Sequence, residues 1–361
     1  MGIAKSFLAV LIVPTLLVSA VRAQGKAEAI KFRTVDGVTI KGKFYPGEKD
    51  APTVMILPNV GEESKKKSWN TLAEELQKKG YAVLTFDYRG HGGSTGIEAE
   101  VFWSKKHVFN YLVPGYKEKA RTIENKYDKK YYPALLNDIA AAKAFLDRKN
   151  DAKECNSSRL VLIGAETGAA LGAVWLRSEW NRYNVKLNPL GKPWVDPRTG
   201  RPMTDKPPEG TATICAIWLS ISPNLGGRQL SLASVLAKPA REKAVPMIFM
   251  YSDQDKSGKA IAKDLEKNLV TNKKIDKYRF TFAAECKDSG KLKGSELLQK
   301  ANINSILGYL DEATKDKGDD WMERDFRKSA YVWWTGFGPP VVAKLPDDMN
   351  LIFYTYESFM R

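Results

Sequence analysis

Histidine is the scarcest of the residues that commonly carry acid–base chemistry, since the 361-residue chain has only two, His91 and His107. Imidazole is the usual general base in proteins because its unperturbed pKa lies close to neutral pH. Both histidines lie in the first third of the chain. A mechanism that takes its general base from a histidine in the remaining two thirds is therefore excluded.

Cysteine is also rare, and the odd count of three leaves at least one free thiol. Cys155 precedes a predicted strand, whereas Cys286 follows a later one. Parallel strands would place these two residues at opposite ends of a sheet, which argues against a disulfide between them. We therefore expect Cys155, Cys215 and Cys286 to be buried, unreactive thiols.

The apolar run near the N-terminus is too short for a membrane-spanning helix, which needs roughly 20 residues. It covers residues 7–21, contains Pro14 and is preceded by a positive charge. Val21-Arg22-Ala23 then supplies the small-x-small pattern of a cleavage site. These features predict that residues 1–23 are a signal peptide. The mature protein would be periplasmic or extracellular, with no transmembrane span after cleavage.

Acidic residues are fewer than basic ones. The chain has 57 Lys and Arg and 42 Asp and Glu, which gives a formal net charge of +15. This excess favours attraction to an anionic envelope polymer or to lipid headgroups, although a solvated basic surface explains the same count. The lysines are scattered, and no nucleic-acid recognition motif accompanies them. We expect no specific nucleic acid partner, no metal ion and no cofactor.

Short apolar runs alternate with amphipathic segments along most of the chain. A β-hairpin is predicted at residues 29–45, with its turn at 35–37. The further predicted strands are 53–57, 82–86, 159–163, 214–221, 246–251 and 278–283. The predicted helices are 70–79, 135–149, one that begins near 169, 261–270 and 295–314. This alternation predicts an α/β fold with a mainly parallel central sheet covered by helices on both faces.

Two segments interrupt this alternation. Residues 99–132 are polar and aromatic, and residues 182–210 contain six prolines, which cannot lie inside helices or central strands. Both are predicted to be cap-like insertions over the carboxyl ends of the strands, where such sheets bind ligands. An aromatic C-terminal extension, residues 316–361, is expected to pack on the domain formed by residues 24–315. A carbohydrate- or partner-binding platform is the alternative for this extension.

Two motifs carry a resemblance to a known family. The strand 159–163 runs into Gly164-Ala165-Glu166-Thr167-Gly168, which is followed by a helix of small residues. An earlier strand runs into Asp87-Tyr88-Arg89-Gly90-His91-Gly92-Gly93-Ser94. Together they resemble the α/β-hydrolase superfamily, nearest its serine aminopeptidase and lysophospholipase-like branch, over roughly residues 28–313. The resemblance implies the α/β-hydrolase fold, in which Gly-x-Ser-x-Gly forms a strand–turn–helix elbow.

The resemblance also implies a role for the second motif. In the family this loop is structural, so Asp87, Arg89 and His91 are expected to organise the loop rather than react. The family's catalytic histidine follows the elbow in the chain, whereas His91 and His107 both precede it. The usual imidazole is therefore missing.

The three triad positions of the family fall on Glu166, Asp255 and Lys293. Glu166 replaces the nucleophilic serine, and Asp255 follows the strand 246–251, with Asp253 as its neighbouring alternative. The family's His-Gly-x-x-Leu-Leu pattern reads Lys-Gly-Ser-Glu-Leu-Leu from Lys293 onward. Lysines also occur at 287 and 291, so this alignment is the loosest of the three.

The oxyanion loop departs from the family pattern as well. The usual His-Gly after the third strand is replaced by Pro58 and Asn59, followed by Val60. The resemblance places Asn59 and Val60 in this loop. The backbone N–H of Thr167 is left as one candidate oxyanion donor.

These substitutions change the chemistry that the site can perform. A carboxylate nucleophile such as Glu166 needs no deprotonation, but a charged lysine has no lone pair with which to accept a proton. Two neighbouring carboxylates favour that charged form. The sequence therefore predicts a degenerate triad in which Glu166, Lys293 and Asp255 form an ion-paired cluster. If this cluster is buried, Lys293→Met should cost roughly 3–5 kcal/mol of stability.

Three functions remain compatible with the sequence. The first is a non-catalytic binding or scaffold module that holds a small-molecule or peptide ligand in its cleft. The second is a divergent, serine-independent hydrolase of esters or peptides that uses Glu166. The third is an envelope interaction protein that uses its basic surface or its aromatic tail.

Overall fold

The computed structural model describes most of the chain between residues 25 and 344. The described residues are 25–115, 120–190, 192–204, 208–225, 227–242, 244–270, 280–315, 317, 321, 330–333 and 341–344. The predicted signal peptide and most of the C-terminal extension lie outside them, so those two expectations stay predictions.

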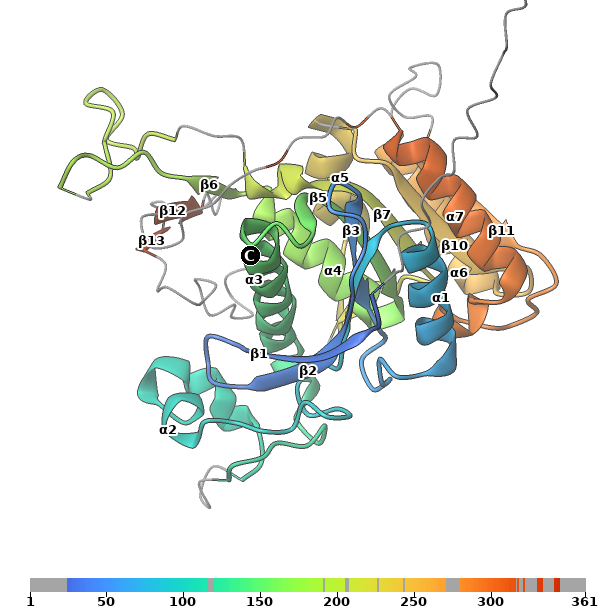
Figure 1. Ribbon diagram of the computed structural model, residues 1–361, viewed down its shortest axis with the longest axis horizontal. Helices are drawn as coiled ribbons and strands as arrows, with labels where there is room; N and C mark the ends of the chain where they lie inside the picture. The colour runs from blue at the N-terminus through green and yellow to red at the C-terminus, as the bar shows by residue number, and fades with distance from the viewer. Residues whose placement is uncertain are drawn as a thin grey trace, which may run out of the picture.

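An eight-stranded sheet forms the centre of the molecule (Figure 1). Its order is β1 (Glu28–Arg33), β2 (Thr39–Tyr45), β4 (Ala82–Phe86), β3 (Pro52–Leu57), β5 (Asn156–Ala165), β7 (Thr213–Leu219), β10 (Met247–Ser252) and β11 (Phe282–Cys286). The hairpin strands β1 and β2 pair antiparallel, and β2 also runs antiparallel to β4. The other neighbouring pairs are parallel. The predicted fold class, a mainly parallel sheet within an α/β fold, is confirmed.

Helices cover both faces of this sheet. One face carries α1 (Lys67–Lys78) and α7 (Lys300–Thr314), and the other carries α3 (Leu136–Asp151), α4 (Glu166–Glu179), α5 (Leu232–Glu242) and α6 (Lys256–Leu269). In Figure 1, α1 and α7 lie to the right of the sheet, with α3 and α4 to its left. Two hydrophobic cores result, one on each face.

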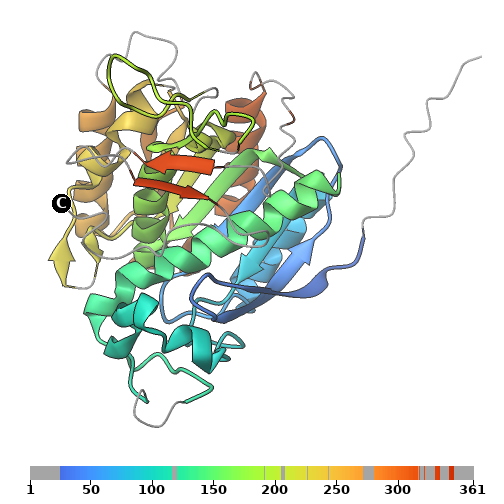
Figure 2. The same cartoon turned by 90° about the vertical axis from the view of Figure 1, so that its left-hand side faces the viewer.

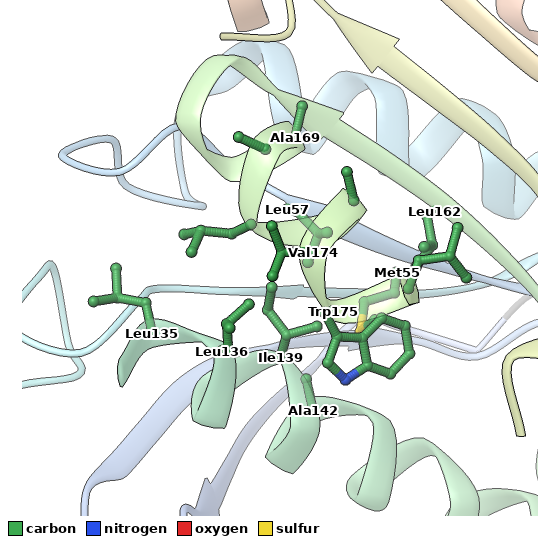
Figure 3. Close-up of a cluster of buried hydrophobic side chains, with 14 of the residues drawn as sticks. Met55, Leu57, Leu135, Leu136, Ile139, Ala142, Leu162, Ala169, Val174 and Trp175 are labelled. Carbon is green, nitrogen blue, oxygen red and sulfur yellow. The ribbon is translucent and has the colours of Figure 1, made fainter. Parts of the chain in front are cut away.

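Alternation along the strands divides the apolar residues between these cores. In β3, Met55 and Leu57 belong to the core beneath α3 and α4, whereas Val54 and Ile56 face α1 and α7. Figure 3 shows Met55 and Leu57 packed between the sheet and helices α3 and α4, beside Trp175. Side chains in a strand point alternately to opposite faces, so the continuous apolar runs of the sequence are those of strands buried on both sides.

Several element boundaries differ from those that the sequence predicts. Helix α6 begins at Lys256 rather than near 261, because the Asp255 side chain caps it by accepting a hydrogen bond from the Gly258 N–H. Helix α5 was not predicted, since Pro239 lies inside it. Strand β11, the last strand of the central sheet, begins at Phe282, four residues later than the predicted start at 278.

The three thiols are free and buried, as expected from the sequence. Burial raises the pKa of the Cys286 thiol to about 11, which keeps it protonated at neutral pH. Cys155 precedes β5, and Cys286 ends β11. The two therefore lie at opposite ends of a parallel array.

The two predicted cap-like insertions lie at opposite ends of the sheet, as Figures 1 and 2 both show. Residues 99–132 begin beyond the carboxyl end of β4. They contain α2 (Ala99–Phe102) and the 3₁₀ helix η1 (Lys105–Leu112), and a second 3₁₀ helix, η3 (Lys129–Leu135), begins within them. Phe102 and Tyr131 of this insertion are fully buried in the core beneath α3 and α4.

The second insertion, residues 182–210, does not cover the carboxyl ends of the strands, so that expectation is wrong. Helix α4 starts at the carboxyl end of β5 and runs back along the sheet, and Thr213 of β7 then pairs with Leu160 near the start of β5. The insertion between them consequently lies at the amino ends of the strands. It contains β6 (Arg182–Asn184) and the 3₁₀ helix η4 (Glu209–Ala212).

Two strands of the C-terminal extension join the second insertion. Strand β12 (Ala330–Trp333) pairs antiparallel with β6 on one side and with β13 (Val341–Lys344) on the other. The described strands of the extension therefore pair with the second insertion through β6. A short hairpin, β8 (Asn224–Leu225) and β9 (Arg228–Gln229), lies before α5. Within the described ranges, none of the helices has the length and apolar character to cross a bilayer.

Candidate functional site

Glu166 lies at a sharp turn between strand β5 and helix α4. Ala165 before it is extended, with φ −120° and ψ 135°, and α4 begins at Glu166 itself. Glu166 adopts φ +46°, a left-handed conformation that costs a non-glycine residue of order 1–3 kcal/mol. Such a conformation persists only where the surroundings impose it. The turn therefore has the strained strand-to-helix geometry of a nucleophile elbow, with a glutamate at its apex.

The two glycines of the motif allow close backbone packing at the elbow. A Cβ atom on Gly168 would lie 2.0 Å from the backbone oxygen of Pro58, and one on Gly164 would lie 2.8 Å from the Cα of Ala169. Neither distance is possible for a real side chain. Gly168 thus allows α4 to approach the chain at the end of β3, and Gly164 allows the first turn of α4 to approach the end of β5.

Asn59, at the end of β3, joins the two residues at the apex of the elbow. Its Nδ2 donates to Oε1 of Glu166 at 3.3 Å, and its Oδ1 accepts the backbone N–H of Thr167 at 3.2 Å. Both contacts require the same orientation of the Asn59 amide, because a backbone N–H needs an acceptor and a carboxylate needs a donor. The N–H predicted as an oxyanion donor is therefore already engaged. Val60, the other predicted loop residue, packs against the core beneath α3 and α4.

Asp255 and Lys293 are brought together from two separate segments. The Lys293 Nζ lies 3.3 Å from Oδ2 of Asp255, whose other oxygen caps α6. The Asp255 side chain is 6% exposed, whereas the Lys293 side chain is 49% exposed. The burial on which the predicted cost of Lys293→Met depends is therefore not met at this lysine, which lies just before the 3₁₀ helix η6 (Gly294–Leu297). Asp253, the neighbouring alternative, is exposed.

Glu166 lies beside this pair without being the acid to which Lys293 binds. A Cβ atom on Gly294 would lie 2.5 Å from Oε1 of Glu166, so the backbone after Lys293 passes directly over the carboxylate. Burial raises the pKa of Glu166, and the negative charge of Glu62 raises it further. The positive charge of Lys293 lowers it by a smaller amount. The structure thus gathers Glu166, Asp255 and Lys293 in one place, with the direct ion pair between the last two.

A second polar cluster next to Glu166 was not predicted from the sequence. Lys66 Nζ lies 2.6 Å from Oε1 of Glu62 and donates to Oγ of Ser295 at 2.9 Å. The Ser295 hydroxyl donates to the same Glu62 oxygen, and Trp69 Nε1 donates to the other at 2.8 Å. Only the four-residue spacing of Glu62 and Lys66 was visible in the sequence. Ser295 joins them from 229 positions further along the chain than Lys66.

The charges around Glu166 leave an acidic excess. Lys66 neutralises Glu62, and Lys293 neutralises Asp255. Two carboxylates, Glu166 and the exposed Glu296, remain, and the charge of Glu296 adds to the rise in the pKa of Glu166. A positively charged group is therefore the electrostatic complement of this site.

The Asp87–Ser94 loop is fixed by its own network of buried contacts. Arg89 is fully buried and binds both Asp36 and Asp138. Asp87 accepts hydrogen bonds from the backbone and hydroxyl of Ser64, each at 2.7 Å. His91 is buried, with Nδ1 2.9 Å from the carbonyl oxygen of Arg89, and burial lowers its pKa. These contacts are those of a neutral histidine within a structural loop.

Metal chemistry finds no support among the described residues, where no group of three or more His, Cys, Asp and Glu side chains is placed to hold an ion. The expected absence of metal and cofactor stays a prediction.

No family model matches the chain. It is 32% identical over 83 residues to the thiohydrolase aneE of Aspergillus aculeatus, a match that covers 23% of this chain and 26% of that protein. The chain therefore spans about a quarter of the length of the curated relative that it matches.

Solved structures that resemble the chain include hydrolases. They include an esterase from Pyrococcus furiosus (13% identity, 79% of this chain and 90% of that chain, TM-score 0.49) and a dienelactone hydrolase from Anabaena variabilis (14%, 81% and 98%, 0.46). A serine hydrolase without a lid from Xanthomonas campestris is a third (11%, 80% and 94%, 0.42). At these identities the similarity concerns the fold alone.

Proposed function

We propose that this protein, which has the α/β-hydrolase fold, is a non-catalytic member of that fold whose elbow site binds a ligand. The elbow site comprises Glu166, Asn59, Thr167, Asp255 and Lys293. The observation that carries the proposal is the Asn59 side chain, which engages both the Glu166 carboxylate and the Thr167 N–H. An oxyanion that binds the Thr167 N–H would have to displace Oδ1 of Asn59 from it.

Each step of acyl transfer lacks its usual group. Glu166 replaces the hydroxyl that would form the acyl–enzyme. Lys293 is ion-paired with Asp255, and an ammonium with no lone pair cannot take a proton from water. Loss of triad function typically lowers the rate by about 10⁶-fold. A scaffold that keeps the elbow geometry while lacking these groups is consistent with binding rather than turnover.

The ligand that best complements the site carries a positive charge. Among the described residues, neither Glu166 nor Glu296 forms an ion pair with a lysine, and Glu166 is partly buried. A primary amine or guanidinium of a small molecule or peptide would restore the charge balance and donate hydrogen bonds to Glu166. This acidic site contrasts with the net charge of the whole chain, which is +15.

A divergent hydrolase is the second candidate, and the raised pKa of Glu166 favours it. A carboxyl group whose pKa is raised by burial and by neighbouring acids is suited to general acid–base work. Glu166 would then activate water directly, without a serine or a histidine. This alternative requires that removal of the Glu166 carboxylate abolish turnover of an ester or peptide.

Ligand binding is tested by thermal shift with lysine- and arginine-bearing dipeptides, run beside matched acidic dipeptides. The proposal expects a rise in Tm with the basic dipeptides, which disappears in Glu166→Gln. A rise that is equal in Glu166→Gln, or that appears with acidic dipeptides, would contradict it.

Export is a further part of the proposal, supported by the sequence of residues 1–23. N-terminal sequencing of the protein recovered from outside the cytoplasm tests it. A mature N-terminus at Gln24 is expected, and an intact Met1 on protein that stays in the cytoplasm would contradict it.

A further inference from the structure

Residues 185–204 form an arm that projects from the body of the molecule, at the upper left in Figure 1. Three short segments of the arm are joined by hydrogen bonds. The Lys186 N–H donates to the carbonyl of Met203 at 2.9 Å, and the Trp194 and Met203 amides extend the pairing at 2.8 Å each. Strand β6, at the base of the arm, pairs with β12. The arm is thus an ordered extension of the fold.

Two turns at the tips of the arm satisfy their own backbone groups. In the first, Asn188 and Lys192 are joined by a backbone bond of 2.8 Å, and the Asn188 side chain accepts the amide of Leu190. In the second, Asp196 and Arg201 are joined in the same way at 2.9 Å. A proline follows the Asn or Asp in each turn and brings no backbone donor. Polar groups that are bonded internally make it less costly for a loop to leave water.

Exposed apolar side chains are concentrated on this arm. The Leu190 side chain, at the tip of the first turn, is 81% exposed, and Trp194 is 47% exposed. Val195 and Met203 are exposed beside them. Among the large apolar residues whose exposure the structure describes, Leu112 is the one other that is exposed. Exposed apolar groups gathered on one projection indicate a contact surface.

Basic side chains occur on the same arm as these apolar groups. Residues 185–204 contain four basic residues and a single acid, Asp196. The basic residues, all exposed, are Lys186, Lys192, Arg198 and Arg201. The guanidinium of Arg198 lies 3.7 Å from Asp196, so the acid is itself balanced. The arm therefore combines positive charge with an apolar tip.

We infer that this arm inserts into the headgroup region of an anionic lipid bilayer. Trp favours the boundary between headgroups and acyl chains, and exposed Leu190 would enter the apolar layer beneath it. Lysine and arginine side chains would bind the anionic headgroups above. The shape supports a lipid surface over a protein partner, because the apolar side chains stand on a convex projection rather than in a groove.

The arm acts independently of the elbow site. It lies at the amino ends of the strands, whereas Glu166 lies at the carboxyl end of β5. A protein bound through the arm would hold its elbow site away from the bilayer. The inference consequently does not rest on the proposed function, and either can fail alone.

Co-sedimentation of the full chain with vesicles tests the inference. The vesicles are phosphatidylcholine alone, or an equal mixture with phosphatidylglycerol. The apolar variant is Leu190→Ser with Trp194→Ser, and the charge variant is Lys192→Glu with Arg198→Glu. The matched control is Lys31→Glu with Lys300→Glu, which changes the net charge by the same amount on exposed positions outside the arm. Any contribution from residues 1–23 is common to all these proteins.

The parent is expected to bind the anionic vesicles and to bind phosphatidylcholine far more weakly. Each basic residue near an anionic surface contributes roughly fivefold to partitioning, so the charge variant should lose at least tenfold. The apolar variant should lose at least tenfold as well, while the control stays within about threefold of the parent. Equal losses in the control and the charge variant would overturn the inference, because only net charge would then matter.

Tryptophan quenching gives a second measurement that does not depend on the stability of the double variants. Lipids brominated on their acyl chains should quench the fluorescence of the parent, and Trp194→Phe should remove that quenching. Quenching that survives in Trp194→Phe would overturn insertion of the arm. Failure of the parent to bind either vesicle would also overturn it, and would favour a protein partner for this surface.

Discussion

Asn59 accepts the backbone N–H of Thr167 at 3.2 Å while it donates to the Glu166 carboxylate at 3.3 Å. The Thr167 amide is the group that would stabilise a developing oxyanion in a serine hydrolase of this fold. Removing one oxyanion donor costs about 10²–10³ in rate where the other catalytic groups are present. Here the donor is engaged by a neighbouring side chain, and a glutamate and a lysine lie at the positions that the family resemblance assigns to the nucleophile and the base. We therefore expect the elbow to bind a ligand without catalysing acyl transfer.

Glu166→Gln is expected to stabilise the protein at neutral pH. Burial and the charge of Glu62 raise the pKa of Glu166 above the value of 4.5 for an unperturbed carboxyl. Between 4.5 and the raised pKa the folded state binds more protons than the unfolded state, so stability falls as pH rises through this window. The glutamine side chain in Glu166→Gln does not titrate, so this loss of stability disappears, and its oxygen can still accept the hydrogen bond from Asn59. Melts at pH 7 should give a higher Tm than the parent.

The pH dependence of Tm provides a control for Glu166→Gln. Below pH 4.5 the parent carboxyl is protonated in both states, so the difference in Tm between parent and Glu166→Gln should shrink towards zero. A difference that is constant from pH 4 to pH 7 would show that the charge of Glu166 is not its cause.

Lys293→Met is expected to cost less than about 1 kcal/mol. The lysine is half exposed, and a pair between an exposed ammonium and a carboxylate contributes roughly 0–1 kcal/mol. Urea unfolding of the variant and the parent measures the difference. A loss of 3 kcal/mol or more would mean that Lys293 holds a buried charge in solution, contrary to its exposure here.

Arg89→Met should destabilise the protein by roughly 3–5 kcal/mol, because it strands two buried carboxylates. Asp36 and Asp138 both bind Arg89, and all three side chains are fully buried. Arg33→Met is the control, since Arg33 pairs with Glu98 where both side chains are over 40% exposed. That control should cost at most about 1 kcal/mol. Equal losses in the two variants would contradict the structural role of the Asp87–Ser94 loop.

Gly168→Ala should destabilise the elbow by roughly 1–3 kcal/mol or more, because the added carbon meets backbone rather than a movable side chain. The nearest atoms are the carbonyl oxygens of Pro58, at 2.0 Å, and Leu57, at 2.7 Å. Gly308→Ala provides the opposite case within α7. It meets nothing within 4 Å and should stabilise the helix by up to about 1 kcal/mol. Chemical denaturation of both variants measures the contrast, and a neutral Gly168→Ala would contradict the close packing of the elbow.

The sequence was sufficient to predict the fold and the turn on which Glu166 lies. Apolar strands buried on both faces appear as continuous runs, and a glycine on each side of Glu166 marks close backbone approach. The start of α6 was harder to predict, because the role of Asp255 as its N-cap is visible only in the folded structure. Helix α5 escaped prediction because Pro239 lies inside it.

Contacts within the site were harder to predict because they join residues distant in sequence. Asn59 and Glu166 are separated by 107 positions, and Glu62 and Ser295 by 233. No local pattern records such pairs. The position of the arm was also hard to predict from the sequence, because it depends on the direction in which α4 runs back along the sheet. Its apolar and basic residues are plain in the sequence, but their exposure is not.

The most direct test of the central claim is a hydrolysis screen of the protein beside Glu166→Ala and Glu166→Ser. The substrates are short- and long-chain aryl esters, aminoacyl anilides and lysophospholipids. A site without a base or a free oxyanion donor predicts no turnover above Glu166→Ala, and none in Glu166→Ser, with all three proteins folded by circular dichroism. Turnover by the parent that disappears in Glu166→Ala would contradict the account and establish Glu166 as the catalytic group of a divergent hydrolase.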